Sequence, residues 1–130
     1  MPRVVWALHY DRPHIEIELH ATAKKMKVRR LIADTGAGNA QSAFELVLPL
    51  ADCQAARGHL MGQVQLRGAY AGTFPVYSVK VQLPQLGFKK SVSAVGVTNI
   101  PNGFDGIAGF KFLDRFHYGN FGIPNQFGLE

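Results

Sequence analysis

The stretch Leu31-Ile32-Ala33-Asp34-Thr35-Gly36-Ala37-Gly38-Asn39 carries the strongest functional signal in this chain. Its apolar start predicts the end of a buried strand, and its two glycines predict a tight turn directly afterwards. The acid is thereby placed at a strand end, where a rigid scaffold can hold a reactive side chain. The same letters also fit an ordinary turn that begins with an aspartate, so the stretch alone leaves both readings open.

The segment 14–20 predicts a half-buried strand, because apolar and polar residues alternate along it. The apolar positions, which are expected to face the core, are Ile15, Ile17 and Leu19. His14, His20 and the glutamates between them share the other face, which we expect to be exposed. No third ligand stands at a spacing known for metal sites, so these histidines do not predict one.

A hairpin is predicted from Gln63–Leu66 and Val76–Leu83, which are both strand-like. Its connecting segment holds small residues around one aromatic: Gly68, Ala69, Tyr70, Ala71 and Gly72. One reading is a plain loop. The other is a mobile flap that closes over a bound ligand.

The remaining pattern predicts an all-β, mostly antiparallel fold. Val28–Ala33 and Ser91–Val97 read as strands, whereas Gln41–Leu48 fits either a strand or a helical turn. Asp52–Arg57 could form one helical turn, capped by its aspartate. The apolar spacing near Lys111–Phe116 predicts one short C-terminal helix. A length of 130 residues fits a single domain, spanning residues 1–130.

The composition, with 47% hydrophobic and 18% charged residues, is that of a globular domain. No apolar run reaches the length of about 20 residues that spans a membrane, and the start lacks the apolar core of a signal peptide. Cys53 is the only cysteine, which excludes an intrachain disulfide and a multi-cysteine metal site. We therefore expect a cytoplasmic protein with no membrane partner.

The formal net charge of +5 raises the question of nucleic acid as a partner. The one dense basic run, residues 24–30, lies beside a predicted strand, where lysines also discourage wrong strand pairing. No recognition motif accompanies the run. A small basic β-domain that binds nucleic acid is therefore the weakest of the functional classes considered.

Two glycine-bearing motifs occur in the chain, one in its first third and one near its C-terminus. The first is Ala33-Asp34-Thr35-Gly36-Ala37-Gly38, and the second is Asp105-Gly106-Ile107-Ala108-Gly109-Phe110-Lys111-Phe112-Leu113, which leads into the predicted helix. With the hairpin between them, they resemble the retropepsin-like aspartic proteases, which include the retroviral enzymes and bacterial relatives. The first motif matches the family's Asp-Thr/Ser-Gly-Ala signature, and the second matches its late hydrophobic-hydrophobic-glycine element.

The resemblance implies a closed β-barrel, with Asp34 as the catalytic carboxylate. Thr35 would hold the active-site loop through its hydroxyl, Gly36 would offer its backbone to the substrate, and Ala37 would complete the loop. Three residues would pack beneath this loop: Ile107, Ala108 and Gly109. The resemblance also implies a homodimer that hydrolyses a peptide or protein substrate without a metal or another cofactor.

The chain departs from the retroviral pattern at two positions. Retroviral enzymes carry an acid where this chain has Gly38, and a basic residue where it has Phe110, so the ion pair that braces retroviral dimers is absent. The resemblance makes the apolar termini, Val4–Leu8 and Phe121–Leu129, candidates for strands at the dimer interface. The alternative is that these termini complete each chain's own sheet.

The chemistry of peptide hydrolysis by water needs one carboxylate that takes a proton and one carboxyl that donates a proton. Two carboxyls held a few ångströms apart share a proton, because both cannot easily ionise together. This chain has one Asp-Thr-Gly motif, so the second carboxyl would come from a second copy across a two-fold axis. The alternative is a peptide- or protein-binding domain of the same fold without proteolysis.

Overall fold

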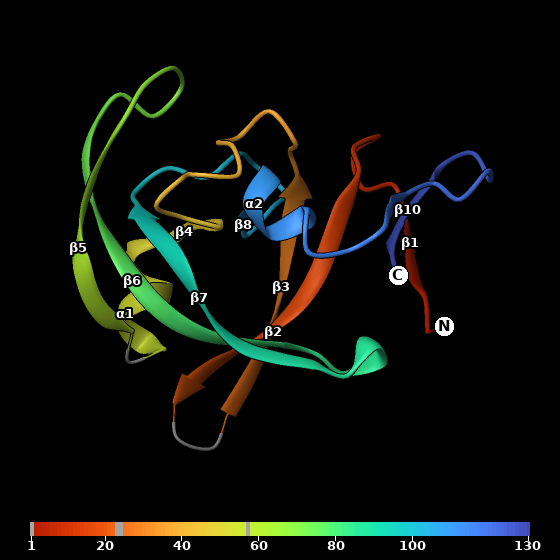
Figure 1. Ribbon diagram of the computed structural model, residues 1–130, viewed down its shortest axis with the longest axis horizontal. Coiled ribbons are helices and arrows are strands. Elements are labelled where there is room, and N and C mark those ends of the chain that lie inside the picture. Colours follow the sequence, from red (N-terminus) through yellow and green to blue (C-terminus); the bar gives the residue numbers. More distant parts are fainter. Residues whose placement is uncertain (1, 23–24, 57) are drawn as a thin grey trace.

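The computed structural model describes residues 2–22, 25–56 and 58–130, and it consists mostly of β-strands (Figure 1). The strands are β1 (Val4–Ala7), β2 (His14–Thr22), β3 (Lys25–Ala33), β4 (Leu46–Pro49), β5 (His59–Leu66), β6 (Gly72–Leu83), β7 (Phe88–Val97), β8 (Gly106–Ala108), β9 (Tyr118–Gly119) and β10 (Gln126–Leu129). The helices are α1 (Leu50–Ala55), the 3₁₀-helix η1 (Pro84–Leu86) and α2 (Phe110–Leu113).

Six strands close into a barrel in the order β2-β3-β8-β4-β7-β6. The closing contact is antiparallel and pairs Glu18 with Gln82 and Leu19 with Val81. Most neighbours are antiparallel, and β3–β8 and β4–β7 are the parallel pairs. β5 pairs with the first part of β6, residues 72–78, outside the contact that closes the barrel. The two strands form a long hairpin, on the left in Figure 1. The predicted all-β barrel is thus confirmed.

The barrel is filled by one large apolar cluster. The alternation predicted over 14–20 is confirmed, since Ile15, Ile17 and Leu19 are all buried in it. The strand β4 is buried on both faces, and Leu46 and Leu48 join the same cluster. The residue between them faces a second cluster, whose buried members are Ile32, Phe44, Val47, Val95, Val97 and Ile107. This second cluster forms the floor below the β5–β6 hairpin.

The helices differ from the expectation of a single C-terminal one. α2 begins at Phe110 and ends at Leu113, so it is shorter and earlier than the predicted 111–116. The helical turn considered over 52–57 forms earlier, as α1, which begins at Leu50 after Pro49. Asp52, the expected cap, instead accepts hydrogen bonds from Arg29. The expected helix end at residue 57 lies outside the described residues. Within the described ranges, no helix is long and apolar enough to cross a membrane.

The ambiguous segment 41–48 forms a loop followed by β4, which begins only at Leu46.

The expectation of an exposed His14 is wrong, because its side chain is 3% exposed. The rings of Trp6 and His9 lie over it, with centroids 6.2 and 5.8 Å from its own ring. Packing of the N-terminal segment onto this end of β2 therefore buries a histidine that alternation places on the outer face.

The terminal strands form a separate small sheet in the order β1-β10-β9. β1 and β10 pair antiparallel within the chain, with Val4 opposite Leu129 and Ala7 opposite Gln126. This is the alternative in which the termini complete the chain's own sheet. Both edges of β10 are occupied, whereas β1 stands at the edge of this sheet among the described strands. Any role of these strands in a dimer stays a prediction.

Candidate active site

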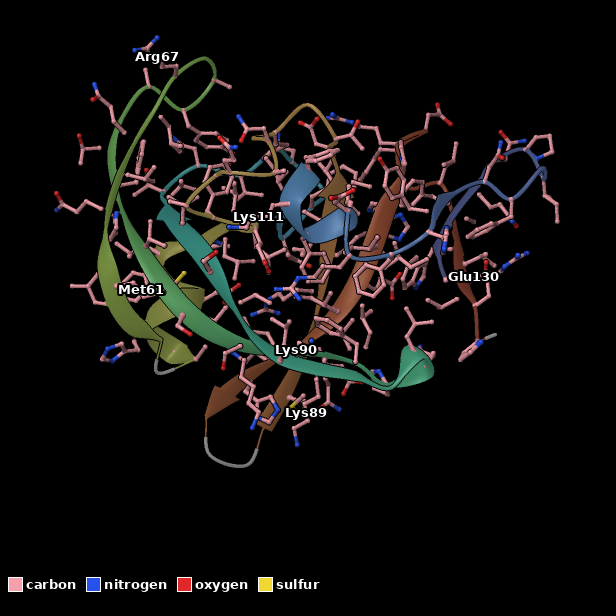
Figure 2. The ribbon with its side chains drawn as sticks, viewed as in Figure 1. Met61, Arg67, Lys89, Lys90, Lys111 and Glu130 are labelled. Atoms are coloured by element: carbon pink, nitrogen blue, oxygen red, sulfur yellow. The ribbon has the colours of Figure 1, made fainter. Side chains whose placement is uncertain are left out.

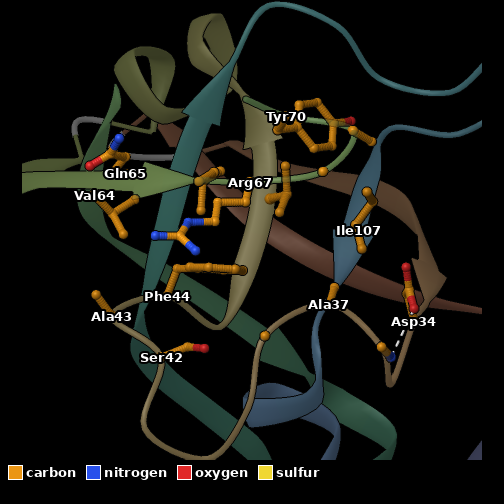
Figure 3. A pocket seen from close by; sticks show the side chains of 16 residues that line it. Asp34, Ala37, Ser42, Ala43, Phe44, Val64, Gln65, Arg67, Tyr70 and Ile107 are labelled. Atoms are coloured by element: carbon orange, nitrogen blue, oxygen red, sulfur yellow. Dashed lines mark hydrogen bonds between the residues drawn. The ribbon is translucent and has the colours of Figure 1, made fainter. Parts of the chain in front are cut away.

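Asp34 stands directly after β3, at the edge of the barrel. The strand end is fixed by backbone hydrogen bonds: the Ala33 N–H donates to the Pro13 carbonyl (3.0 Å), and the Asp34 N–H donates to the Ala108 carbonyl (3.0 Å). The Gly36 N–H donates to Oδ1 of Asp34 at 2.9 Å, drawn as the dashed line in Figure 3. The carboxylate is thus oriented by its own loop while it stays partly exposed.

The late glycine motif lies directly beneath the active-site loop. The Ala37 N–H donates to the Asp34 carbonyl (3.1 Å), and the Ala37 carbonyl accepts from the Phe110 N–H (2.9 Å). The Gly109 N–H donates to the Glu45 carbonyl at 2.9 Å. A Cβ on Gly109 would stand 2.8 Å from the Ala37 carbonyl oxygen, so this close backbone contact requires glycine. The two motifs, far apart in sequence, therefore form one structural unit.

A partly buried ion pair braces the far end of the active-site loop, which we define as residues 34–45. Glu45 is 4% exposed, and its Oε1 accepts from Nη2 (2.6 Å) and Nε (3.1 Å) of Arg115. The ammonium of Lys111, which extends from α2 in Figure 2, donates to the Ser42 carbonyl at 2.8 Å. Lys111 stands within the late motif, and Arg115 follows it two residues later. They tie the loop to the α2 region within one chain, and no spacing in the sequence indicated these contacts.

Asp34 lies between two pockets. The first, a cleft of about 530 Å³, has an apolar wall made by Phe44, Val47, Val64, Leu66, Tyr70 and Ile107 (Figure 3). The second, of about 430 Å³, is lined by Ile32, Ile100 and Pro101 among others. Four residues line both pockets: Asp34, Ala69, Tyr70 and Ile107. Asp34 is the only carboxylate among the described residues that line either pocket.

The predicted flap forms the rim of the cleft. Its tip, residues 67–71, connects β5 to β6, and Leu66 pairs with Gly72 below it. Gly68, Ala69 and Tyr70 line the cleft, whereas Ala71 and Gly72 do not. Tyr70 is half-buried against the second cluster, and this burial raises the pKa of its hydroxyl. Nothing lies within 4 Å of a Cβ built on Gly68, so that part of the tip is unpacked.

The other candidate residues divide into two groups. Ile107, Ala108 and Gly109 are buried beside the active-site loop, where the resemblance placed them. Thr35 is exposed at the tip of the loop, and its bond to a partner loop stays a prediction.

The cysteine offers no competing chemistry. Cys53 is fully buried, and desolvation together with the nearby Asp52 raises the pKa of its thiol to about 12. The thiol therefore stays protonated at neutral pH and is a poor nucleophile. In the part of the chain that the structure describes, no three His, Cys, Asp or Glu side chains are grouped as a metal site.

Comparison with known proteins found no matching family model, no matching curated protein and no matching solved structure. The likeness to retropepsins therefore rests on the two sequence motifs and their order. Sequence reasoning missed the pocket walls and the brace at Glu45, because these contacts join segments that no local pattern connects. The function has to be argued from the geometry around Asp34.

Proposed function

We propose that this protein is a homodimeric, retropepsin-like aspartic endopeptidase. The observation that carries the proposal is the place of Asp34: a partly exposed carboxylate at a strand end, between two apolar pockets and beneath a hairpin. Apolar clefts with one convergent reactive group are typical of substrate sites. An extended peptide would lie along the cleft, with its scissile bond at Asp34 and side chains in the pockets on either side.

The mechanism requires a second carboxyl, which a second copy of Asp34 would supply on a two-fold axis. One Asp34 is charged and takes a proton from a water molecule, whose oxygen attacks the scissile carbonyl carbon. The other Asp34 is protonated and donates its proton to the carbonyl oxygen. Collapse of the tetrahedral intermediate breaks the C–N bond, and a proton passes to the leaving amine. The pair then holds one shared proton again.

The local contacts support this role. The Gly36 N–H orients one oxygen of Asp34, while the exposed Thr35 beside it is accessible to a second copy. The pair of Glu45 and Arg115 braces the loop inside its own chain. In this proposal the Glu45–Arg115 pair takes the place of the ion pair whose residues this sequence lacks.

The decisive test is Asp34→Asn, measured on a diverse peptide pool from acid to neutral pH. Asparagine is nearly the same size, so the fold should survive, but it cannot act as a base. We expect cleavage to fall by at least about 10³-fold, in the range typical of lost acid–base catalysis. Wild-type activity should be higher at acid pH, because one carboxyl of the pair must hold a proton.

The matched control is Asp114→Asn, which removes an exposed carboxylate outside both pockets and should leave cleavage unchanged. Circular dichroism and sedimentation would show that both variants keep their fold and assembly. Cleavage that persists in the Asp34→Asn protein would mean that another residue carries the chemistry.

A second candidate function is a peptide- or protein-binding domain. It is favoured by Gly38 and Phe110, which stand where the retroviral enzymes carry their bracing charges. This function predicts no cleavage at any pH and peptide binding that Asp34→Asn leaves largely unchanged. The same peptide pool, measured for binding as well as for cleavage, distinguishes the two.

A further inference from the structure

The arginines of this protein fall into two groups. Four described arginines lie against carboxylates, in the pairs Arg3–Glu130, Arg29–Asp52, Arg30–Glu16 and Arg115–Glu45. The other two, Arg12 and Arg67, form no ion pair with any described residue, and both are exposed. These two arginines are also the ones that line the pockets beside Asp34.

The two arginines line different pockets beside the carboxylate. Arg67 belongs to the first pocket, and Arg12 belongs to the second. Figure 3 shows the guanidinium of Arg67 above Phe44 and beside Val64, at the end of the cleft away from Asp34. An apolar stretch therefore separates this cation from the reactive carboxylate. In the second pocket, Arg12 shares the lining with Ile100 and Pro101.

An exposed guanidinium without a partner presents free donors to a ligand, and a carboxylate is the ligand group that fits its fork. With Asp34 as the only lining carboxylate, the two pockets carry an excess of positive charge. Acidic side chains further along a bound peptide would meet this charge, whereas basic ones would be repelled.

We infer, on the basis of the proposed peptidase function, that the preferred substrates are peptides with an apolar core and acidic flanks. Apolar side chains would fill the two pockets next to the scissile bond. In the two-fold dimer each arginine occurs twice, once in each copy. Asp or Glu side chains on either flank would therefore pair with Arg67 or Arg12 of the copy that lies against that flank. Because these pairs are exposed, each should change kcat/KM by about two- to three-fold, and mainly through KM.

The test uses two peptides that share an apolar core and carry either Glu or Gln at the flanking positions. Wild type should cleave the Glu peptide about three- to ten-fold more efficiently, and about 1 M salt, where the Debye length is about 3 Å, should remove much of that preference. Arg67→Gln and Arg12→Gln should each lower the preference, and the double variant should abolish it. The preference is the ratio of the kcat/KM values for the Glu and the Gln peptide, so a change that affects both peptides equally does not alter it.

The control is Lys80→Gln, which removes the same charge from an exposed position on β6 outside both pockets. It should leave the preference for Glu unchanged. Equal cleavage of both peptides by wild type would overturn the charge inference and leave the peptidase proposal intact.

Failure to cleave either peptide would count against the peptidase proposal, and binding then tests the charge inference by itself. Fluorescence anisotropy with the Asp34→Asn protein would give the Kd of both peptides without turnover. A Kd for the Glu peptide about three- to ten-fold lower, and lost in the double variant, would support the inference. Equal Kd values would overturn it.

Discussion

The active-site loop and the flap tip face each other across one cleft, but they are held in different ways. The loop, residues 34–45, is bonded to β8, to Phe110 and Gly109, and through Glu45 to Arg115. The flap tip, residues 67–71, makes no backbone hydrogen bond to any described residue outside the β5–β6 pairing. One wall of the cleft is therefore fixed, and the other depends on a hairpin.

This contrast fits the demands of the proposed chemistry. A carboxylate that shares a proton must be held within a fraction of an ångström, which requires a packed and hydrogen-bonded support. A cover over a peptide must instead open to admit it and close to exclude water. The apolar contacts of Tyr70 with the second cluster would hold the flap closed weakly, since few other tip side chains are buried.

The largest expected effect is in amide hydrogen exchange. Amides of Gly68–Gly72 should exchange at least about 10³-fold faster than those of Ile15–Leu19, because the tip opens without unfolding of the barrel. Amides of Phe110 and Gly109, which donate to the active-site loop, should be slow as well. Exchange of the tip as slow as that of the barrel strand would show that the flap is only a rigid turn.

The next prediction tests the Glu45–Arg115 ion pair, which holds the active-site loop to the α2 region. Arg115→Ala leaves the buried carboxylate of Glu45 without its partner and should lower the free energy of unfolding by about 3 kcal/mol. Arg3→Ala is the matched control, because its pair with Glu130 is more exposed and should contribute less than about 1 kcal/mol. Urea denaturation of both variants measures the difference. Equal losses would mean that the brace adds nothing beyond a surface pair.

Part of this structure could be predicted from the sequence alone. The alternation of Ile15, Ile17 and Leu19 predicted a strand with the correct buried face, since one face of a barrel strand is always covered. The hairpin and the strand end at Asp34 were also predictable, because both follow from local glycines and short apolar runs. Local pattern is sufficient where neighbours in sequence decide the structure.

The features that the sequence did not predict depend on segments that meet only after folding. The burial of His14 depends on Trp6, which the small terminal sheet brings over it. The pairing of Glu45 with Arg115 joins positions on both sides of the flap in sequence. The unpaired state of Arg67 was also unpredictable, because it depends on where every carboxylate of the fold lies. A single sequence contains no periodic signal for such contacts.

A smaller effect compares two glycines, one in each wall. In Gly109→Ala the new Cβ would stand 2.8 Å from a backbone oxygen that cannot move freely, and we expect a loss of about 2–3 kcal/mol. In Gly68→Ala nothing lies within 4 Å, but the φ of +79° is strained for alanine and should cost about 1 kcal/mol. Thermal and urea unfolding give both values. A larger loss of unfolding free energy for Gly68→Ala than for Gly109→Ala would contradict the conclusion that the active-site loop is the more tightly packed wall of the cleft.

The smallest effect is a pH dependence of stability at the base of the fixed wall. His14 lies opposite Ile32 in the β2–β3 pairing, close to the strand end that holds Asp34. Burial lowers its pKa below the usual value of about 6.5. Glu16 opposes this shift, while Arg30 and His9 add to it. Its Nδ1 has no hydrogen-bond partner among the described residues.

The sign follows from proton uptake. Below about pH 6.5 the unfolded chain protonates this histidine more readily than the folded chain does, so the free energy of unfolding should fall as the pH is lowered. His14→Phe keeps a ring against Trp6 and does not titrate, so its stability should fall less between about pH 7.5 and pH 5.5. His59→Gln, at an exposed position on β5, controls for the loss of an imidazole elsewhere. Parallel curves for wild type and His14→Phe would show that the buried ring does not couple the fixed wall to pH.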